Sequence, residues 1–250
     1  MLKESLKNGG VALGTWCDLP SPAVVNVLAK AKLDFVIIDM EHGPMDFKIA
    51  QDMLMAAECE GTEALVRVPR LDESDILRSL DLGAAGIIVP HIESVEDRKK
   101  VVAYSKFPPV GQRGFNPYVR GGGYRKADRE YCVIQNERII VGLIIEGVDA
   151  LANLERIIDD PNVDLIYIGT YDLSLALGMP GDVGHPKVLK ALEKAAANVI
   201  KAKKSVGCMI HQASDLARFK ELGIQFITYK IDSAIIYDSV ASIKREFDRL

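Results

Sequence analysis

Residues 34–46 read DFVIIDMEHGPMD, an apolar run that ends in an acid and is soon followed by a Gly-Pro break. Polar residues do not alternate with apolar ones inside the run, and this pattern is typical of a parallel strand covered on both faces. The same pattern recurs along the whole chain. Including this one, eight such runs lie at residues 11–16, 34–39, 63–68, 86–90, 139–146, 164–169, 205–210 and 224–231.

Amphipathic segments follow these runs, so expected strands and expected helices alternate. The expected helices lie at residues 21–32, 46–60, 73–82, 94–104, 148–159, 186–203, 212–222 and 233–247. Eight strand–helix units in 250 residues predict a closed (β/α)8 TIM barrel, formed as a single domain over residues 1–250. A doubly wound open sheet also alternates in this way and is the alternative, although no Gly-x-Gly-x-x-Gly follows the first run.

One long insertion after the fourth strand interrupts the repeat. It contains PPVGQRG at residues 108–114 and RGGGYR at residues 120–125. A Gly-rich, Arg-containing loop on a barrel is expected to form a lid or a subunit contact, and a solvated surface loop is the simpler alternative.

The composition narrows the class of partner. The chain has 48% hydrophobic and 26% charged residues and a formal net charge of −4. It has no cluster of basic residues interleaved with aromatic ones, which argues against binding to nucleic acid or to an anionic membrane. No run approaches the length of a membrane span, and the N-terminal MLKESLKNGG lacks the apolar core of a signal peptide. Small molecules are therefore the expected partners.

The four cysteines are scattered without a Cys-x-x-Cys pair. They are Cys17, Cys59, Cys132 and Cys208. This spacing indicates reduced, buried thiols in a cytoplasmic protein rather than a disulfide framework or a zinc site.

Polar residues at the carboxyl ends of the expected strands are the candidate functional residues, because a TIM barrel carries its site at that face. They are Asp39, Glu41, His42, Arg67, His91, Glu146, Asp172 and Lys230. An aromatic residue at the end of the first strand, Trp16, is expected to form a dry wall of the same pocket.

Glu146 and Asp172 follow neighbouring strands, so their carboxylates are expected to share one cation. Two carboxylates, completed by water and substrate oxygens, are a usual site for a hard divalent ion such as Mg²⁺ or Mn²⁺. Either acid alone is equally well explained as the cap of a helix start.

His42 and Arg67 are also expected to carry chemistry. An imidazole steadied by a neighbouring carboxylate is a good proton acceptor near neutral pH, although a loop histidine is commonly just a surface residue. An arginine at the end of an apolar strand needs an anion, which is either a substrate carboxylate or enolate or a structural partner inside the barrel.

Six stretches in chain order resemble the HpcH/HpaI aldolase family of metal-dependent, pyruvate-using class II aldolases, and within it the 4-hydroxy-2-oxoheptanedioate and 2-dehydro-3-deoxy-sugar-acid aldolases. The stretches are IIDMEHGP, VRVP, GIIVPHIES, PPVGQRG, IIEG and YIGTYDLSLALG. The resemblance implies reversible cleavage of a 4-hydroxy-2-oxo acid to pyruvate and an aldehyde. It also implies a divalent metal, Mg²⁺ or Mn²⁺ with Co²⁺ as an alternative, and a homo-oligomer, since relatives assemble as hexamers.

The resemblance further implies roles for individual residues. It places the catalytic base at His42, with Asp39 as its orienting acid, and the arginine that holds pyruvate and stabilises the enolate at Arg67. It places the metal ligands at Glu146 and Asp172.

The family's Gly-Pro-Ala-Asp turn, whose backbone amides receive the pyruvate carboxylate, corresponds to the turn from Gly169 to Asp172. Thr170 and Tyr171 there replace small or rigid residues, and Ile144 stands where relatives often carry a glutamine. The substrate site is therefore expected to be remodelled.

Lys230 stands where the family usually has glycine, and it is expected to form a salt bridge or to contact the substrate tail. A Schiff base on this lysine would make a class I aldolase, which the two metal-type carboxylates disfavour. A malyl- or citramalyl-CoA-type carbon–carbon lyase is the rival enzyme, and a non-catalytic barrel that binds a keto acid is the rival outside enzymes. The C-terminal stretch AIIYDSVASIKREF, residues 234–247, has enough apolar residues to pack on a neighbouring subunit.

Overall fold

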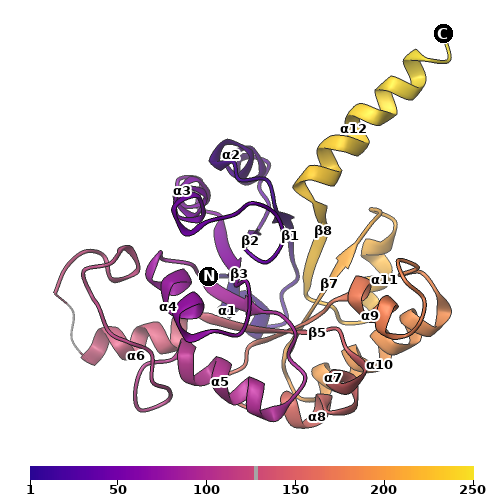
Figure 1. Ribbon diagram of the computed structural model, residues 1–250. Coiled ribbons are helices and arrows are strands. Elements are labelled where there is room, and N and C mark those ends of the chain that lie inside the picture. Colours follow the sequence, from indigo (N-terminus) through magenta and orange to yellow (C-terminus); the bar gives the residue numbers. More distant parts are fainter. Residues whose placement is uncertain (127–128) are drawn as a thin grey trace.

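The computed structural model describes residues 1–126 and 129–250. Eight strands of these described residues close into a parallel barrel, each strand pairing with the next and the last with the first (Figure 1). The strands are β1 (Ala12–Cys17), β2 (Phe35–Asp39), β3 (Glu63–Arg67), β4 (Gly86–Val89), β5 (Ile140–Ile145), β6 (Leu165–Ile168), β7 (Ser205–Ile210) and β8 (Phe226–Ile231). The prediction of a TIM barrel is confirmed, and the open-sheet alternative is wrong.

Helices follow the strands close to where they were expected, and all but the last of them cover the outside of the barrel (Figure 1). They are α2 (Pro22–Lys30), α3 (Phe47–Glu58), α4 (Glu73–Asp81), α5 (Val95–Ser105), α10 (Pro186–Lys201), α11 (Asp215–Glu221) and α12 (Asp232–Phe247). The helix expected at residues 148–159 is divided into α7 (Val148–Ala152) and α8 (Leu154–Ile157). The break lies at Asn153, whose side chain donates to the main-chain oxygen of Glu93 instead of continuing the helical surface.

Four elements were not among the expected helices. They are α1 (Leu2–Lys7), the 3₁₀ helix η1 (Arg120–Gly122), α6 (Arg129–Arg138) and α9 (Thr170–Ala176). Three of them are too brief to show a helical period, and the fourth, α6, buries none of its residues and so has no apolar face to reveal it. Leu2 and Leu6 of α1 join the cluster of side chains inside the barrel. This helix therefore closes the amino end of the barrel and leaves the carboxyl end as its mouth.

Alternate strand residues fill the barrel, and the others pack against the helices. On β2, Phe35 and Ile37 lie inside, whereas Val36 and Ile38 belong to the core between the sheet and the helices. Phe35 stacks on Phe226 of β8 with 3.8 Å between ring centroids. Because this alternation continues to the end of each strand, it decides which polar side chains reach the mouth.

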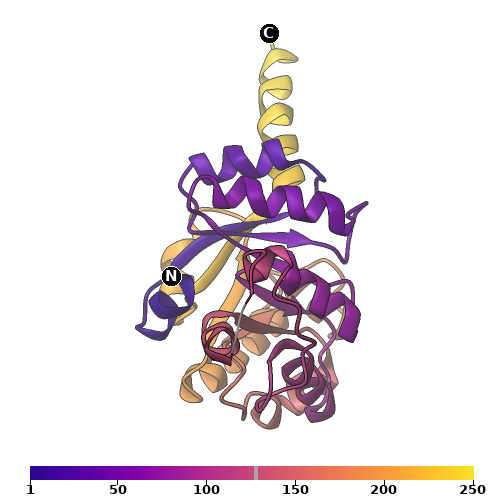
Figure 2. The same cartoon turned by 90° about the vertical axis from the view of Figure 1, so that its left-hand side faces the viewer.

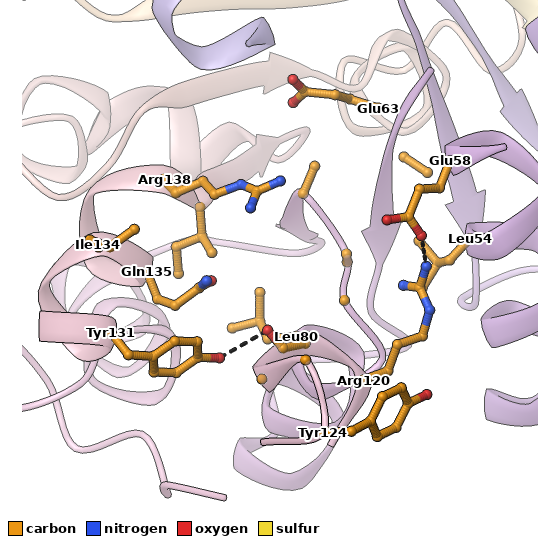
Figure 3. Close-up of a pocket in the computed structure, with 18 of the residues that line it drawn as sticks. Leu54, Glu58, Glu63, Leu80, Arg120, Tyr124, Tyr131, Ile134, Gln135 and Arg138 are labelled. Carbon is orange, nitrogen blue, oxygen red and sulfur yellow. Dashed lines mark hydrogen bonds and ion pairs between the residues drawn. The ribbon is translucent and has the colours of Figure 1, made fainter. Parts of the chain in front are cut away.

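The insertion after β4 lies at the amino end of the barrel, since it follows α5, which runs from the mouth back to that end. A hollow of about 1010 Å³ lies there, and Figure 3 shows Arg138 and Gln135 pointing into it and Arg120 paired with Glu58. The described part of the insertion does not cover its own barrel's mouth, so the expectation of a lid there is wrong. A subunit contact stays a prediction, and residues 127–128 lie outside the described residues.

The last helix, α12, extends away from the barrel in both Figure 1 and Figure 2. Within it only Asp232 is buried. No helix of the described residues has both the length and the apolar character needed to cross a membrane.

The four cysteines are free thiols. Cys17 and Cys208 are buried as predicted, whereas Cys59 is exposed and Cys132 is half-buried. The prediction of burial is wrong for Cys59 because it follows the last turn of α3, on the outer surface.

Candidate active site

A cavity of about 360 Å³ opens at the carboxyl ends of the strands. The structure brings together there the residues for which a catalytic, metal-binding or substrate-binding role was expected. All ten line the cavity: Trp16, Asp39, His42, Arg67, Glu146, Gly169, Thr170, Tyr171, Asp172 and Lys230.

Strand alternation explains how several of these side chains reach the cavity. On β5, the inner series includes Ile140 and Ile144 and ends at Glu146, just beyond the strand. On β7, the same alternation carries from Met209 to His211, which also lines the cavity. Sequence reasoning assigned His211 no role, although counting two residues past Met209 predicts its placement.

Arg67 is held by two carboxylates. Its Nε donates to Asp39 Oδ1 at 2.9 Å, its Nη2 pairs with the other oxygen of Asp39, and its Nη1 lies 2.9 Å from Glu41 Oε2. Burial works to lower the pKa of Arg67, but the hydrogen bonds and charges of Asp39 and Glu41 raise it on balance. Since a guanidinium has five N–H donors, these three contacts leave two donors for another ligand.

Asp39 holds Arg67 and does not hold the imidazole of His42. Its Oδ1 also accepts from the backbone N–H groups of Glu41 at 2.9 Å and His42 at 3.3 Å. The expected contact with the His42 ring is not formed, and Asp39 meets His42 only through the backbone N–H. The His42 side chain is exposed at the rim of the cavity.

Glu146 is buried and is contacted by His91, a residue for which no catalytic role was expected. Glu146 Oε1 accepts from the backbone N–H of His91 at 2.9 Å. The Nδ1 atom of His91 lies 2.9 Å from the same oxygen, and its Nε2 atom lies 2.9 Å from Oε1 of Glu41. Asp39, Arg67, Glu41, His91 and Glu146 therefore form one continuous chain of contacts, named here the charged belt.

The surroundings of Glu146 suit a cation. Burial raises the pKa of Glu146, and the negative charges of Asp172 and Glu41 act in the same direction. A Cβ atom at Gly169 would come within 2.7 Å of Glu146 Oε2, so the glycine leaves open the space beside this oxygen. The donor set is two hard carboxylates, of the kind that Mg²⁺ and Mn²⁺ prefer.

The described residues contain no group of three or more His, Cys, Asp or Glu side chains arranged to hold a metal ion. Asp172 lies in the first turn of α9, and it is exposed to solvent. A metal at this place would therefore take two protein carboxylates, and water and substrate would supply its other ligands.

The wall and floor of the cavity are aromatic. Trp16 Nε1 donates to Tyr167 Oη at 3.0 Å and lies 3.1 Å from Thr228 Oγ1. The guanidinium of Arg67 lies 4.5 Å from the centre of the Trp16 ring. Trp16 thus fixes one face of the cavity and covers the arginine.

His211 and Lys230 line the β7–β8 side of the cavity. Tyr171 meets His211 edge to face with 5.4 Å between ring centroids. Burial lowers the pKa of His211, and its buried Nε2 atom has no hydrogen-bond partner among the described residues. Lys230 Nζ lies 2.5 Å from Asp238 Oδ2, and this hydrogen bond raises the pKa of Lys230. The expected salt bridge of Lys230 is therefore confirmed.

A parallel barrel with an arginine, histidines and carboxylates at its strand ends is the architecture of a TIM-barrel enzyme. Residues 12–238 match the family described as HpcH/HpaI aldolase/citrate lyase. The chain belongs to this family, and the resemblance seen in its sequence motifs is confirmed.

Similar proteins extend over nearly the whole chain. A pyruvate aldolase of Rhizobium etli is 32% identical over 94% of this chain and 92% of its own length. A 5-keto-4-deoxy-D-glucarate aldolase of Klebsiella pneumoniae is 30% identical over 99% of this chain and 96% of its own. The crystal structure of an HpcH/HpaI aldolase from Desulfitobacterium hafniense DCB-2 superposes with a TM-score of 0.95 at 29% identity, covering 100% of this chain and 97% of that one.

Proposed function

We propose that the protein catalyses the reversible, metal-assisted aldol cleavage of a 4-hydroxy-2-oxo acid to pyruvate and an aldehyde. One observation carries the proposal: the same cavity is lined by Arg67, His42, Glu146 and Asp172. Relatives of about 30% identity along nearly the whole chain are named aldolases, which supports the assignment to carbon–carbon lyases.

Glu146 and Asp172 are the proposed ligands of the divalent ion, Mg²⁺ or Mn²⁺, with Co²⁺ as an alternative. When bound, such an ion acts as a Lewis acid that polarises a carbonyl oxygen. Burial, and after it the negative charges of Asp172 and Glu41, raises the pKa of Glu146, which supports this role because a bound cation would stabilise the ionised form.

Arg67 is proposed to stabilise the negative charge that develops on the pyruvate half of the substrate. Two of its donors stay available after Asp39 and Glu41 have taken three. Since those acids already fix the guanidinium, little reorganisation is needed when charge appears, and such preorganised donors contribute strongly to catalysis.

His42 is the proposed base, which takes the C4-hydroxyl proton in cleavage and returns it in synthesis. Its exposure at the rim of the cavity suits transfer through a water molecule. The backbone N–H groups of Thr170 and Tyr171, in the first turn of α9, would receive the pyruvate carboxylate, whereas the N–H of Gly169 donates to the main-chain oxygen of Ile145 at 3.1 Å. Trp16 would exclude water from one face of the substrate.

Lys230 is proposed to contact the aldehyde half and not to form a Schiff base. A nucleophilic lysine must be neutral when it attacks, whereas the hydrogen bond to Asp238 raises the pKa of Lys230 and favours its charged form. This contact supports a metal-dependent reaction over the class I alternative.

The test is a cleavage assay with 4-hydroxy-2-oxo acids that differ in their aldehyde half, with pyruvate release followed by lactate dehydrogenase. We expect release that stops with a chelator and returns with Mg²⁺ or Mn²⁺. Cleavage of citramalyl-CoA, which releases pyruvate and acetyl-CoA, but of no free acid would establish the CoA-lyase alternative. Pyruvate binding without turnover of any substrate would establish the non-catalytic barrel.

We also propose that the protein is a cytoplasmic homo-oligomer, hexameric like the relatives that the motifs resemble. An apolar stripe on α12 supports the assembly, since Ile236, Val240, Ile243 and Phe247 recur at helical spacing and are exposed. A helix with so little contact to its own barrel gains stability by packing on another surface. Light scattering should show the oligomer for the natural chain and a smaller species for Val240→Glu.

A further inference from the structure

His91 contacts carboxylates that come from two other parts of the barrel. The residue follows β4, while Glu41 follows β2 and Glu146 follows β5. Its two ring nitrogens lie 2.9 Å from one oxygen of each acid. An imidazolium donates from both nitrogens and a neutral ring from one, so either form ties at least one acid to the ring.

The backbone of His91 directs the ring to this place. Its φ is 55°, in the left-handed region that is uncommon for residues other than glycine, although histidine adopts it more often than most. Strand alternation alone would not predict that the ring points toward these acids. Every second residue of β4 points into the barrel, and Ile88 is one of them. Residue 91, three positions further on, falls on the opposite face. A disfavoured conformation persists where the surroundings hold it, and such residues cluster at functional sites.

The contacts of His91 leave the two oxygens of Glu146 in different environments. The backbone N–H and Nδ1 of His91 both meet Oε1. The other oxygen, Oε2, faces the open space at Gly169, where a Cβ atom would come within 2.7 Å. His91 therefore turns Oε2 toward the start of α9, the helix that carries Asp172.

His91 also reaches Arg67 indirectly, through Glu41. One oxygen of Glu41 contacts His91 Nε2 and the other contacts Arg67 Nη1, both at 2.9 Å. Glu41 is thus held by His91 through one oxygen and by Arg67 through the other. Removal of the His91 ring would free the first of these oxygens.

We propose that His91 is a positioning residue that orients Glu146 toward the metal and, through Glu41, steadies Arg67. The inference rests on the proposed function, since it concerns the proposed metal ligand and the proposed pyruvate-binding arginine. Hydrogen-bonding partners of metal ligands typically affect metal affinity by about 10- to 100-fold.

Two variants separate the ring from its unusual backbone. His91→Gly removes the ring and suits a positive φ. His91→Asn also tolerates this conformation and retains a short side-chain donor near the position of Nδ1, but it lacks Nε2. Lys32→Gly is the matched control, because Lys32 is exposed and has a φ of 66°.

The experiment titrates each purified protein with Mn²⁺ by calorimetry, then with pyruvate at saturating Mn²⁺, and records thermal unfolding. We expect His91→Gly to bind Mn²⁺ about 10- to 100-fold more weakly without a loss of thermal stability. His91→Asn should recover part of the Mn²⁺ affinity while pyruvate binding stays weak. Lys32→Gly should match the natural protein in both titrations.

The outcomes distinguish this inference from the proposed function. If the natural protein binds Mn²⁺ and His91→Gly binds it equally well, the positioning role is wrong and the metal site stands. The role is also wrong if His91→Gly loses Mn²⁺ affinity and thermal stability together, because a general loss of structure then explains the weaker binding. If the natural protein binds no divalent ion, the proposed function fails first and the inference with it.

Discussion

On the β2–β5 side of the mouth, a continuous belt of contacts joins Asp39, Arg67, Glu41, His91 and Glu146, whereas on the β7–β8 side His211 and Lys230 lie outside that belt. Among the described residues the Nε2 atom of His211 has no hydrogen-bond partner, and Lys230 pairs with Asp238 of the protruding helix α12. Groups that act on a reacting bond must be held in fixed geometry by their neighbours. The difference supports the proposal that the belt, together with the turn from Gly169 to Asp172, serves the common pyruvate half of the substrate, whereas the looser β7–β8 side serves the variable aldehyde half.

The largest effect, a loss of metal binding, is expected from removing the negative charge of Glu146 at the end of the charged belt. Glu146→Gln keeps the shape of the side chain but loses an anionic ligand, so Mn²⁺ binding should be abolished. Asp172→Asn should do the same. Calorimetric titration measures this directly, and unchanged affinity in either variant would remove that residue from the metal shell.

His42→Ala should lower kcat by about 10² to 10⁴, the usual contribution of a general base. Its affinity for Mn²⁺ and pyruvate should change little, because the exposed ring belongs to no contact of the belt. A kcat within a few-fold of the natural protein would show that His42 is not the base.

Arg67→Lys breaks the belt in its middle while it keeps the charge. A lysine cannot reproduce the planar fork that meets Asp39, and the loss of one oriented donor to a developing oxyanion typically costs about 10² to 10³ in rate. We expect kcat/KM for cleavage to fall by about that factor. Near-normal kinetics would mean that only the positive charge matters at this position.

Lys230→Met tests the proposal that the looser side of the mouth contacts the aldehyde half of the substrate. Since the lysine is placed near the aldehyde half, we expect the ratio of kcat/KM between substrates with different aldehyde halves to shift by less than about tenfold. The rate of pyruvate methyl proton exchange, which involves no aldehyde, serves as the internal comparison. A loss of that exchange equal to the loss of cleavage would place Lys230 in the catalytic chemistry and overturn the division between the two sides.

The smallest effect on activity is expected from a change at Asp232, the first residue of α12, which belongs neither to the charged belt nor to the looser side of the mouth. Burial and the neighbouring Asp18 raise the pKa of Asp232 from 3.8 to about 7. A raised carboxyl pKa stabilises the folded state below the unfolded value, and this contribution is lost as the pH rises through the folded value. The free energy of unfolding should therefore fall between about pH 4 and pH 7, by at most about 1.4 kcal/mol per pH unit. Asp232→Asn should remove this slope in denaturant titrations.

The sequence predicted the barrel and most of its mouth because both follow from strand alternation. Apolar runs such as the one ending at Asp39 require burial on two faces, and the polar residue that ends each run must then lie at the mouth. A structural partner for Arg67 was one of the two alternatives, but the sequence did not identify it as Asp39. The two residues lie side by side in the register of β2 and β3, and a single sequence does not give register.

The contacts of His91 with Glu41 and Glu146 were missed for a different reason. The His91 ring reaches Glu146 through a positive φ, which is not evident from the hydrophobic pattern. The lid expected from the insertion was wrong because the sequence shows where an insertion falls along the chain but not which end of the barrel it covers.

The exchange of pyruvate methyl protons in D₂O, followed by NMR without any aldehyde, tests the metal-assisted mechanism most directly. We predict exchange that requires added Mg²⁺, stops with a chelator and is absent in Glu146→Gln, with no adduct trapped on Lys230 by borohydride. Exchange that continues in the presence of the chelator, together with a borohydride-trapped pyruvyl adduct on Lys230, would contradict it.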